Sequence, residues 1–348
     1  MASTHHPESS LDRPGALIAA LPAVLGFVPA QSLVLVTVAD GETGAVLRSD
    51  LSDAGETLSQ LADLASRSGA ESVLAVIVDD KGAGCPMCAD EHRWLADSLA
   101  AELADRGIEL IATNVVAEVA AGARWHCVDG CGNSGLVEDP TSSPSAVAAV
   151  LDGRRLYRRR EDLVQVVATA DPARTAALEV RIAAADASPG QRSDAQVRAA
   201  IEHALGCAER HGRGQSPSDE QLTRLALALT DARVRDTLYA LAVGDRAAEA
   251  EALWAALARC LPARWRVEAL VLLAFSAYSR GDGPLAGISL DAALRCAPEH
   301  RMAGMLDQAL QAGMRPEQIR ELATTGYRLA RQLGVRLPPR RMFGRRAG

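Results

Sequence analysis

The sequence predicts an α/β domain with a mixed, layered sheet, followed by an all-helical domain. Two observations indicate the first domain: continuous apolar runs rich in β-branched residues at 32–38 and 72–80, and helical patterns that follow such runs. The third observation indicates the second domain, because only helical periodicity continues after about residue 139. A chain of 348 residues is long enough for two domains of ordinary size.

The α/β domain, residues 14–138, consists of elements that each carry a local signal. The run 72–80 is apolar at nearly every position, which is typical of a central strand buried on both faces. Residues 56–69 place apolar side chains at helical spacing and end in glycine, which predicts a helix. In chain order we expect an apolar helix ending near Gly26, strands at 32–38 and 45–51, a helix at 56–69, a strand at 72–80, a helix at 89–107, a strand at 108–119 and a hairpin arm at 122–128.

The helical domain, residues 139–330, begins at the turn-rich segment "EDPTSSPS". One tetratricopeptide-like unit is predicted at about 267–300, with a degenerate neighbour at 233–266. We expect these helix pairs to offer a groove to an unknown protein partner. The polar N-terminus, 1–13, and the basic tail, 331–348, lack periodicity and are predicted to be disordered. The positions that match the small and large packing sites of the repeat are Leu270, Leu273, Ala274, Ala277, Ala286, Leu290, Ala293 and Pro298.

Composition and charge exclude several classes of protein. Hydrophobic residues make up 48% and charged residues 23% of the chain, which is typical of globular proteins. The net charge of −7 gives no general reason to expect nucleic-acid binding. No apolar run is long enough for a membrane span, and the N-terminus lacks the pattern of a secretory signal, so we expect a cytoplasmic protein. Seven cysteines in such a protein indicate thiols or a metal site rather than a disulfide framework.

Two cysteine pairs carry most of the chemistry that the sequence offers. Cys85 and Cys88 stand in "GAGCPMCADEH", and Cys127 and Cys131 stand in "RWHCVDGCGNSG". Four thiolates in two glycine-containing turns suit tetrahedral zinc, which binds sulfur at about 2.3 Å. If the hairpin pairs residue 117 with residue 123, Cys127 lies opposite Thr113 and both pairs approach one edge of the sheet. We therefore predict a structural zinc site with these four cysteines as ligands.

The cysteine pattern also leaves other interpretations open. His92 and His126 are alternative zinc ligands, although His126 and Cys127 point to opposite faces of an extended strand. The segment "CPMC" at the start of a helix resembles a redox dithiol, because the helix N-terminus lowers the pKa of a thiol. Buried cysteines also behave as small apolar side chains, which is the interpretation for Cys207, Cys260 and Cys296 in the alanine-rich helices.

Asp79 is the candidate ligand-binding carboxylate. It follows the predicted central strand, at the position where open α/β sheets bind their ligands. Its neighbour Asp80 points the opposite way along the chain, so we expect no shared role. The glycine-rich loop after them lacks the Walker pattern, and no G-x-S-x-G motif is present, so the motifs support neither nucleotide binding nor a serine hydrolase.

Four stretches of the sequence resemble the bacterial domain of unknown function 4192 family. They are "LIAALPAVLGFVPAQSLVLVTV", "RWHCVDGCGNSG", "GRRLYRRREDL" and "LLAFSAYSRGDGPLAGISLDAALRCAPEHRMAGMLDQAL". The resemblance runs from about residue 13 to about residue 325. It places Trp125, Cys127 and Cys131 at the family's tryptophan–cysteine hairpin, where many relatives have adjacent cysteines and this chain has "CGN". The resemblance implies domain boundaries and assigns no activity.

The function expected from the sequence is that of a non-enzymatic interaction or regulatory protein stabilised by zinc. A closed site with four protein ligands leaves no position for a reactive water, so such a zinc ion is structural. The alternative is an enzyme that uses the Cys85/Cys88 dithiol for redox chemistry, or Asp79 with a metal for hydrolysis. A third alternative is nucleic-acid binding through the arginine-rich tail, which would make affinity depend steeply on salt.

Overall fold

A computed structural model describes residues 13–85, 87–151, 154–186 and 192–341. The chain forms two compact units, one made of Met1–Asp162 with Gln311–Gly313 and the other of Leu163–Leu310 with Met314–Gly348. We call them the N-terminal unit and the helical unit. The predicted disorder of the N-terminus falls on residues 1–12, which lie outside the described residues.

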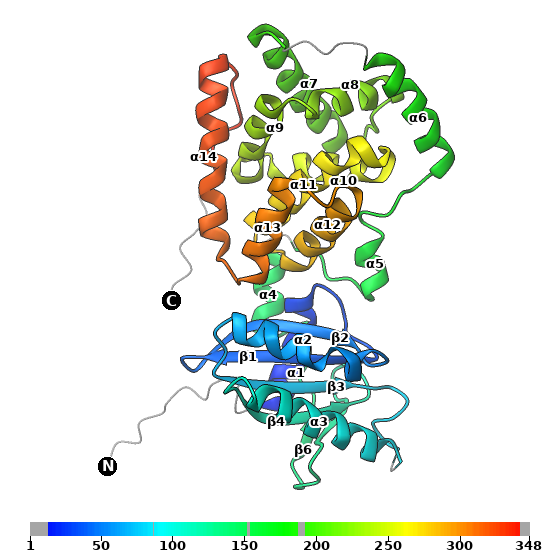
Figure 1. Cartoon of the computed structure of the whole chain (residues 1–348), viewed down its shortest axis with the longest axis vertical. Coiled ribbons are helices and arrows are strands. Elements are labelled where there is room, and N and C mark those ends of the chain that lie inside the picture. The colour runs from blue at the N-terminus through cyan, green and yellow to red at the C-terminus, as the bar shows by residue number, and fades with distance from the viewer. Residues whose placement is uncertain (1–12, 86, 152–153, 187–191, 342–348) are drawn as a thin grey trace. The chain divides into compact units, whose positions relative to one another are not determined.

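The N-terminal unit contains a mixed six-stranded sheet, which confirms the predicted fold class (Figure 1). The strand order is β2-β1-β3-β4-β5-β6, with β3 and β4 parallel and all other neighbours in this sheet antiparallel. The strands are β1 (Ser32–Ala39), β2 (Glu42–Asp50), β3 (Ser72–Val78), β4 (Glu109–Val116), β5 (Arg124–Cys127) and β6 (Ser134–Leu136). The helices of this unit are α1 (Pro14–Leu25), α2 (Ala54–Arg67), α3 (Cys88–Ala104) and α4 (Pro144–Leu151).

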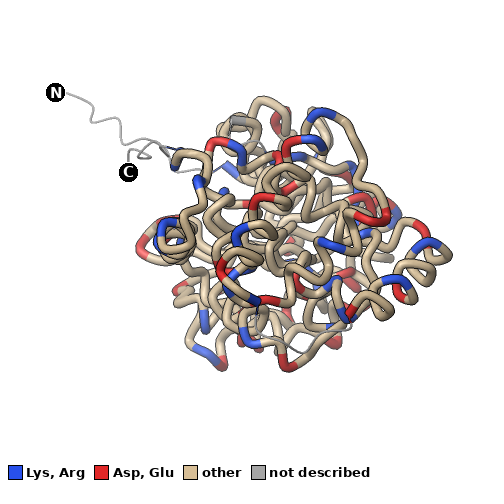
Figure 2. The backbone as a smooth tube through the Cα atoms, turned by 90° about the horizontal axis from the view of Figure 1, so that it is seen from above, with Lys and Arg blue, Asp and Glu red and all other residues tan. Residues whose placement is uncertain are grey.

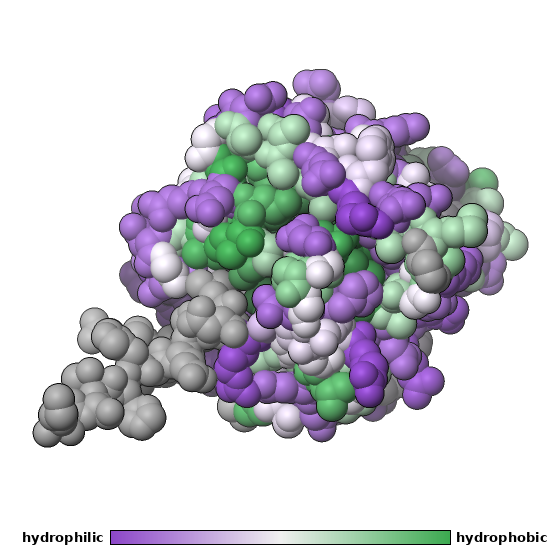
Figure 3. Space-filling view, turned by 90° about the horizontal axis from the view of Figure 1, so that it is seen from below, coloured by the Kyte–Doolittle hydropathy of each residue, from purple (hydrophilic) through white to green (hydrophobic). Residues whose placement is uncertain are grey.

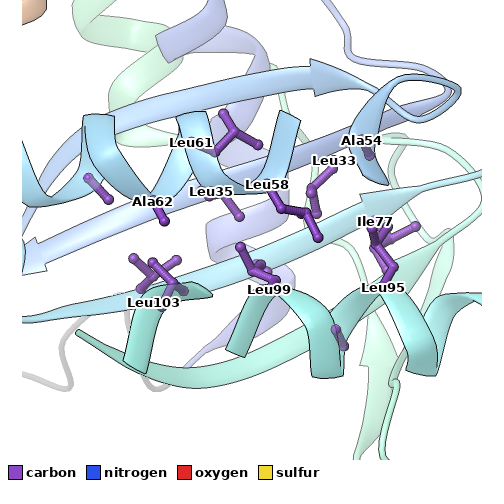
Figure 4. Packing of buried hydrophobic residues seen from close by; sticks show 14 of the residues in the cluster. Leu33, Leu35, Ala54, Leu58, Leu61, Ala62, Ile77, Leu95, Leu99 and Leu103 are labelled. Atoms are coloured by element: carbon purple, nitrogen blue, oxygen red, sulfur yellow. The ribbon is translucent and has the colours of Figure 1, made fainter. Parts of the chain in front are cut away.

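The two faces of the sheet have different coverings. One face packs against α2 and α3, through a core that includes Leu33, Ile77 and Val115 (Figure 4). Side chains alternate along a strand, so Val76 and Asn114 point to the other face. Helix α1 packs against that face, and its Gly15 lies against the Trp125 ring nitrogen and the backbone of Leu136. We call the face that packs against α2 and α3 the α3 face, and we call the opposite face the α1 face.

The register of the β4–β5 hairpin differs from the predicted one by a single residue. Cys127 pairs with Asn114, whereas the prediction placed it opposite Thr113. Directly opposed residues of an antiparallel pair point to the same face, so the observed register puts Cys127 on the α1 face. His126 pairs with Val115 and therefore points to the α3 face. The register therefore determines which side chains lie near Cys127 and which lie near His126.

Helices make up the rest of the described chain, as predicted. The starts of α7 and α8 have capping boxes, in which Ser193 and Ser218 accept hydrogen bonds from backbone N–H groups three residues on. The helices are α5 (Arg160–Val164), α6 (Pro172–Ala185), α7 (Asp194–Gly212), α8 (Asp219–Leu229), α9 (Ala232–Leu238), the 3-10 helix η2 (Tyr239–Val243), α10 (Ala247–Cys260), α11 (Ala263–Ser279), α12 (Gly283–Cys296), α13 (Arg301–Gln311) and α14 (Pro316–Leu333).

Helices α11 and α12 form the pair in which the repeat was predicted. Every packing position that the pattern named is buried except Pro298, which is exposed. Acidic and basic residues are interspersed along the chain (Figure 2), and some pair across helices, as Arg280 does with Glu251 at 2.9 Å. The tetratricopeptide-like assignment stays a prediction.

Two segments differ from what the sequence pattern predicted. Strand β6 was not predicted, because its three residues include a glycine and show no apolar alternation. The tail was predicted to be disordered from residue 331, but α14 continues to Leu333. Beyond it, Arg341 donates its backbone N–H to the carbonyl of Val243 at 2.8 Å. Among the helices that the structure describes, none has the length and apolar character needed to cross a membrane.

Candidate dithiol site

Asp79 lies just beyond the carboxyl end of β3, where its backbone N–H donates to the Val116 carbonyl of β4. Only 7% of the residue is exposed. The carboxylate accepts hydrogen bonds on both oxygens. Oδ1 accepts from Gln31 Nε2 at 2.9 Å and from the Lys81 backbone N–H at 3.0 Å, and Oδ2 lies 2.9 Å from His92 Nε2. This carboxylate is therefore an organising centre for two loops and the first turns of α3.

Hydrogen bonding decides the charge of Asp79. Burial alone raises the pKa of a carboxyl group, because it removes the charged form from water. Here the Gln31 side chain, the Gly82 N–H, His92 and the Lys81 N–H outweigh burial and hold the pKa of Asp79 below its ordinary value of 3.8. Asp79 is therefore ionised at neutral pH.

Gln31 was not identified from the sequence as part of the site. Its backbone φ of 44° lies in the left-handed region, which few residues other than glycine adopt. The side-chain amide donates to Asp79 and also to Asp80. A glutamine before a strand carries no sequence signal for such a role, and only the folded backbone brings it to Asp79.

Gly82 allows the loop after β3 to pass directly over the carboxylate. A Cβ atom at this position would lie 2.0 Å from Asp79 Oδ2 and 3.0 Å from the Cβ of Cys88. Only a residue without a side chain fits between these groups. Asp79 and Cys88 therefore both lie close to Gly82.

Cys85 and Cys88 stand at the start of α3, and both are partly exposed. The Cys85 backbone N–H donates to the Gly82 carbonyl at 2.9 Å, and its carbonyl accepts from the Ala89 N–H at 3.1 Å. The two thiols lie close enough for each to shift the pKa of the other. The backbone contacts place both cysteines at the N-terminus of α3.

The two thiols have opposite acidities. The backbone N–H of Cys88, the Cys88 thiol and the backbone N–H of Met87 all stabilise a Cys85 thiolate, so the pKa of Cys85 is lowered. The pKa of Cys88 is raised, first by its hydrogen bond to Cys85 and then by partial burial and the nearby negative charges, Asp79 among them. The pair therefore consists of one acidic thiol and one that keeps its proton.

Cys127 and Cys131 form a second pair of neighbouring thiols, at and just after the end of β5, and each shifts the pKa of the other. The Cys127 thiol donates to Asp129 Oδ2 at 3.6 Å. Burial raises the pKa of Cys127 to about 11. Cys131 is exposed, and its pKa is lowered by the backbone N–H of Asn133 and by the Cys127 thiol. This pair, like the first, therefore combines one thiol with a lowered pKa, Cys131, and one with a raised pKa, Cys127.

His126, which lies in the second cysteine hairpin, is affected electrostatically by His92 of α3. His126 points to the α3 face, and its pKa is lowered by partial burial and by the charge that His92 can carry. His92 is buried and bonded to Asp79. The two predicted alternative ligands therefore face the same side of the sheet, but Cys127 points away from them.

Within the described residues, no group of three or more His, Cys, Asp and Glu side chains is placed to hold a metal ion. The structure brings Cys85 to Cys88 and Cys127 to Cys131, but it does not bring the four predicted zinc ligands into one group. The physical reason is the hairpin register, which turns Cys127 to the α1 face. The zinc site stays a prediction.

The remaining cysteines lie in the helical unit. Cys207 is buried in α7, where Arg210 Nη2 lies 3.2 Å from its sulfur. Cys260 and Cys296 end α10 and α12 and are partly exposed. They provide internal controls for the reactivity of the two pairs.

Comparisons with known proteins identify the family without naming an activity. Neither the curated proteins nor the solved structures contain a match to this chain. A family model described as "Domain of unknown function (DUF4192)" matches residues 14–317. That match covers nearly the whole of both units, so the chain belongs to the DUF4192 family.

Proposed function

We propose that this protein carries out thiol–disulfide exchange, with Cys85 as the attacking thiolate and Cys88 as the resolving thiol. One observation carries the proposal: two neighbouring, partly exposed thiols stand at the start of α3, one with a lowered and one with a raised pKa. A thiolate is the nucleophile in such exchange, and helix N-termini favour it. Of the functions predicted from the sequence, this arrangement supports the redox alternative best.

The reaction follows from the two acidities. The Cys85 thiolate attacks one sulfur of a substrate disulfide, a Cys85–substrate disulfide forms, and one substrate thiolate leaves. Cys88 then loses its proton and attacks the Cys85 sulfur. The Cys85–Cys88 disulfide forms and the second substrate thiolate leaves. The substrate gains two electrons, and the protein dithiol loses them.

His92 is the group that we assign to accept the Cys88 proton. Cys88 and His92 are four residues apart in α3, which places them on one face of the helix. Asp79 fixes His92 through its 2.9 Å contact with Nε2. Asp79 acts as a positioning residue, and its charge is one of the smaller effects that raise the pKa of Cys88.

The surroundings of the thiols suit a bulky substrate. Met87, between the two cysteines, is 81% exposed, and Trp94 is a further exposed apolar residue of α3. Hydrophobic residues reach the surface among polar ones on the face shown in Figure 3. We include the cytoplasmic location predicted from the sequence in this proposal, because the reducing thiols of the cytoplasm keep such a dithiol reduced.

A trapping experiment tests which cysteine attacks. With oxidised glutathione as the probe, a Cys88→Ser variant is expected to accumulate a stable glutathione mixed disulfide on Cys85, because no thiol resolves it. In a Cys85→Ser variant, Cys88 is expected to react at least about tenfold more slowly at pH 7, because it remains protonated. Intact-protein and peptide mass spectrometry measures both products.

A Cys296→Ser variant is the matched control, since this cysteine lies in the helical unit and should leave formation of the Cys85–Cys88 disulfide unchanged. Equal trapping at Cys88 and Cys85 would contradict the assigned roles. The zinc site and the interaction role predicted from the sequence are the competing account. One bound zinc per chain, with both cysteine pairs protected, would support that account instead.

A further inference from the structure

The second cysteine pair is built into a tight hairpin turn. The Cys127 backbone N–H donates to the Asn133 carbonyl at 2.9 Å, and the Gly130 N–H donates to the Cys127 carbonyl at 3.4 Å. Gly130 and Gly132 have φ values of 65° and 85°, which glycine adopts without strain. This turn reverses the chain direction and brings the Cys131 thiol next to the Cys127 thiol, where each shifts the pKa of the other.

The position of this pair separates it from Cys85 and Cys88. Cys127 points to the α1 face, whereas Cys88 begins the helix that covers the other face. The sheet therefore lies between Cys127 and that helix. The described residues form no group that would join the two pairs through a metal ion. Within each pair the two cysteines have each other as the neighbouring thiol, and the two pairs make separate backbone contacts.

Asn114 gives the second pair a distinct environment. It lies directly opposite Cys127 in the β4–β5 ladder and is only 2% exposed. Its side-chain nitrogen is buried, and no hydrogen-bond acceptor for it is found among the described residues. An unsatisfied buried donor is rare in folded proteins and calls for an explanation. A Cys127 sulfur that carries negative charge during exchange would be an acceptor for this donor.

We propose that Cys127 and Cys131 form a second thiol–disulfide exchange site, which works independently of Cys85 and Cys88. The exposed Cys131 thiolate attacks a disulfide of a small molecule or a protein, and one thiolate leaves. The buried Cys127 then gives up its proton to Asp129, whose Oδ2 lies 3.6 Å from the Cys127 sulfur, and attacks the Cys131 sulfur. The Cys127–Cys131 disulfide forms, and the second thiolate leaves and takes up a proton. Two protein thiols are oxidised, and the attacked disulfide is reduced to two thiols.

The sequence allows both pairs to be followed at once by tryptic digestion. Cys85 and Cys88 share the peptide 82–93, and Cys127 and Cys131 share the peptide 125–154. The full chain is equilibrated in glutathione buffers of increasing oxidised fraction, alkylated and digested. A disulfide within a pair then appears as one unalkylated peptide, whereas a disulfide between the pairs links the two peptides.

We expect a disulfide to form within the peptide 125–154 in the wild-type chain. A Cys85→Ser/Cys88→Ser variant is expected to show the same oxidation, with a midpoint glutathione ratio within about twofold of wild type, because separate sites act additively. A Cys127→Ser/Cys131→Ser variant is expected to retain oxidation of the peptide 82–93. Circular dichroism verifies that each variant is folded.

The outcomes distinguish this second site from the first. If the peptide 125–154 stays reduced in every buffer, the second site is excluded, whatever happens at Cys85 and Cys88. If linked peptides dominate, the two pairs are not independent and the inference fails. If only the peptide 125–154 becomes oxidised, the second site stands and the function proposed for Cys85 and Cys88 is wrong. The wild-type chain alone yields each of these results, so the inference does not depend on the folding of a variant.

Discussion

Replacing Asp79 by alanine is expected to lower the free energy of unfolding by about 3–5 kcal/mol. The substitution removes the acceptor of two side-chain and two backbone N–H donors, contributed by Gln31, His92, Lys81 and Gly82. Donors that are left buried without a partner lose their hydrogen bonds with water and gain none in the protein. Denaturant unfolding of the full chain, followed by circular dichroism, measures the loss.

Asp80→Ala is the matched control for this experiment. Asp80 is the next residue, is exposed, and also accepts a hydrogen bond from Gln31. Its removal leaves no buried donor without a partner, so we expect a change within about 0.5 kcal/mol. If both variants lose the same stability, the buried carboxylate is not the organising group of this loop.

Replacing Gly82 by alanine is expected to cost about 2–3 kcal/mol and to slow resolution of the mixed disulfide at Cys85. The new Cβ atom would lie 2.0 Å from Asp79 Oδ2 and 3.0 Å from the Cβ of Cys88, so both groups must move. Asp79 would then no longer hold His92 beside Cys88. Two measurements are needed: unfolding by denaturant, and the decay of the glutathione adduct on Cys85 under single-turnover conditions.

Gly84→Ala is the control two residues further along the same loop. A Cβ atom there meets no other atom within 4 Å among the described residues, and the backbone is not left-handed. Alanine also restricts the unfolded chain, so stability should be unchanged or higher by up to about 1 kcal/mol. Loss of stability in both variants would mean that flexibility of the loop, rather than space beside Asp79, explains the glycine at position 82.

The elements of the sheet could be predicted from sequence where burial imposes a pattern. β1 and β3 are buried along nearly their whole length, so their apolar runs identified them. β6 could not be predicted, because it exists only through pairing with β5 and contains no apolar run. The extent of the tail was also missed, since Arg341 is ordered by contact with Val243 and not by local pattern.

The cysteine pairs could be predicted, but their grouping could not. Spacing alone identified Cys85 with Cys88 and Cys127 with Cys131, because two thiols in one turn meet through local backbone geometry. Whether the pairs meet each other depends on the register of β4 and β5, in which a shift by one residue exchanges the faces. The hairpin loop carries no signal strong enough to fix that register. The role of Gln31 was equally hidden, since it depends on a left-handed backbone.

The most direct test of the central claim is the pH dependence of alkylation at Cys85 in the wild-type chain, measured with and without a zinc chelator. The pKa of Cys85 is lowered by backbone N–H groups and the Cys88 thiol, so its thiolate persists to lower pH than that of an ordinary cysteine. We expect Cys85 to react faster than Cys88, Cys127 and the three cysteines of the helical unit. Its midpoint should lie below the ordinary thiol pKa of 9.0, and the chelator should not change it. Thiols that stay protected until chelation releases about one zinc per chain would contradict the dithiol and establish the metal site in its place.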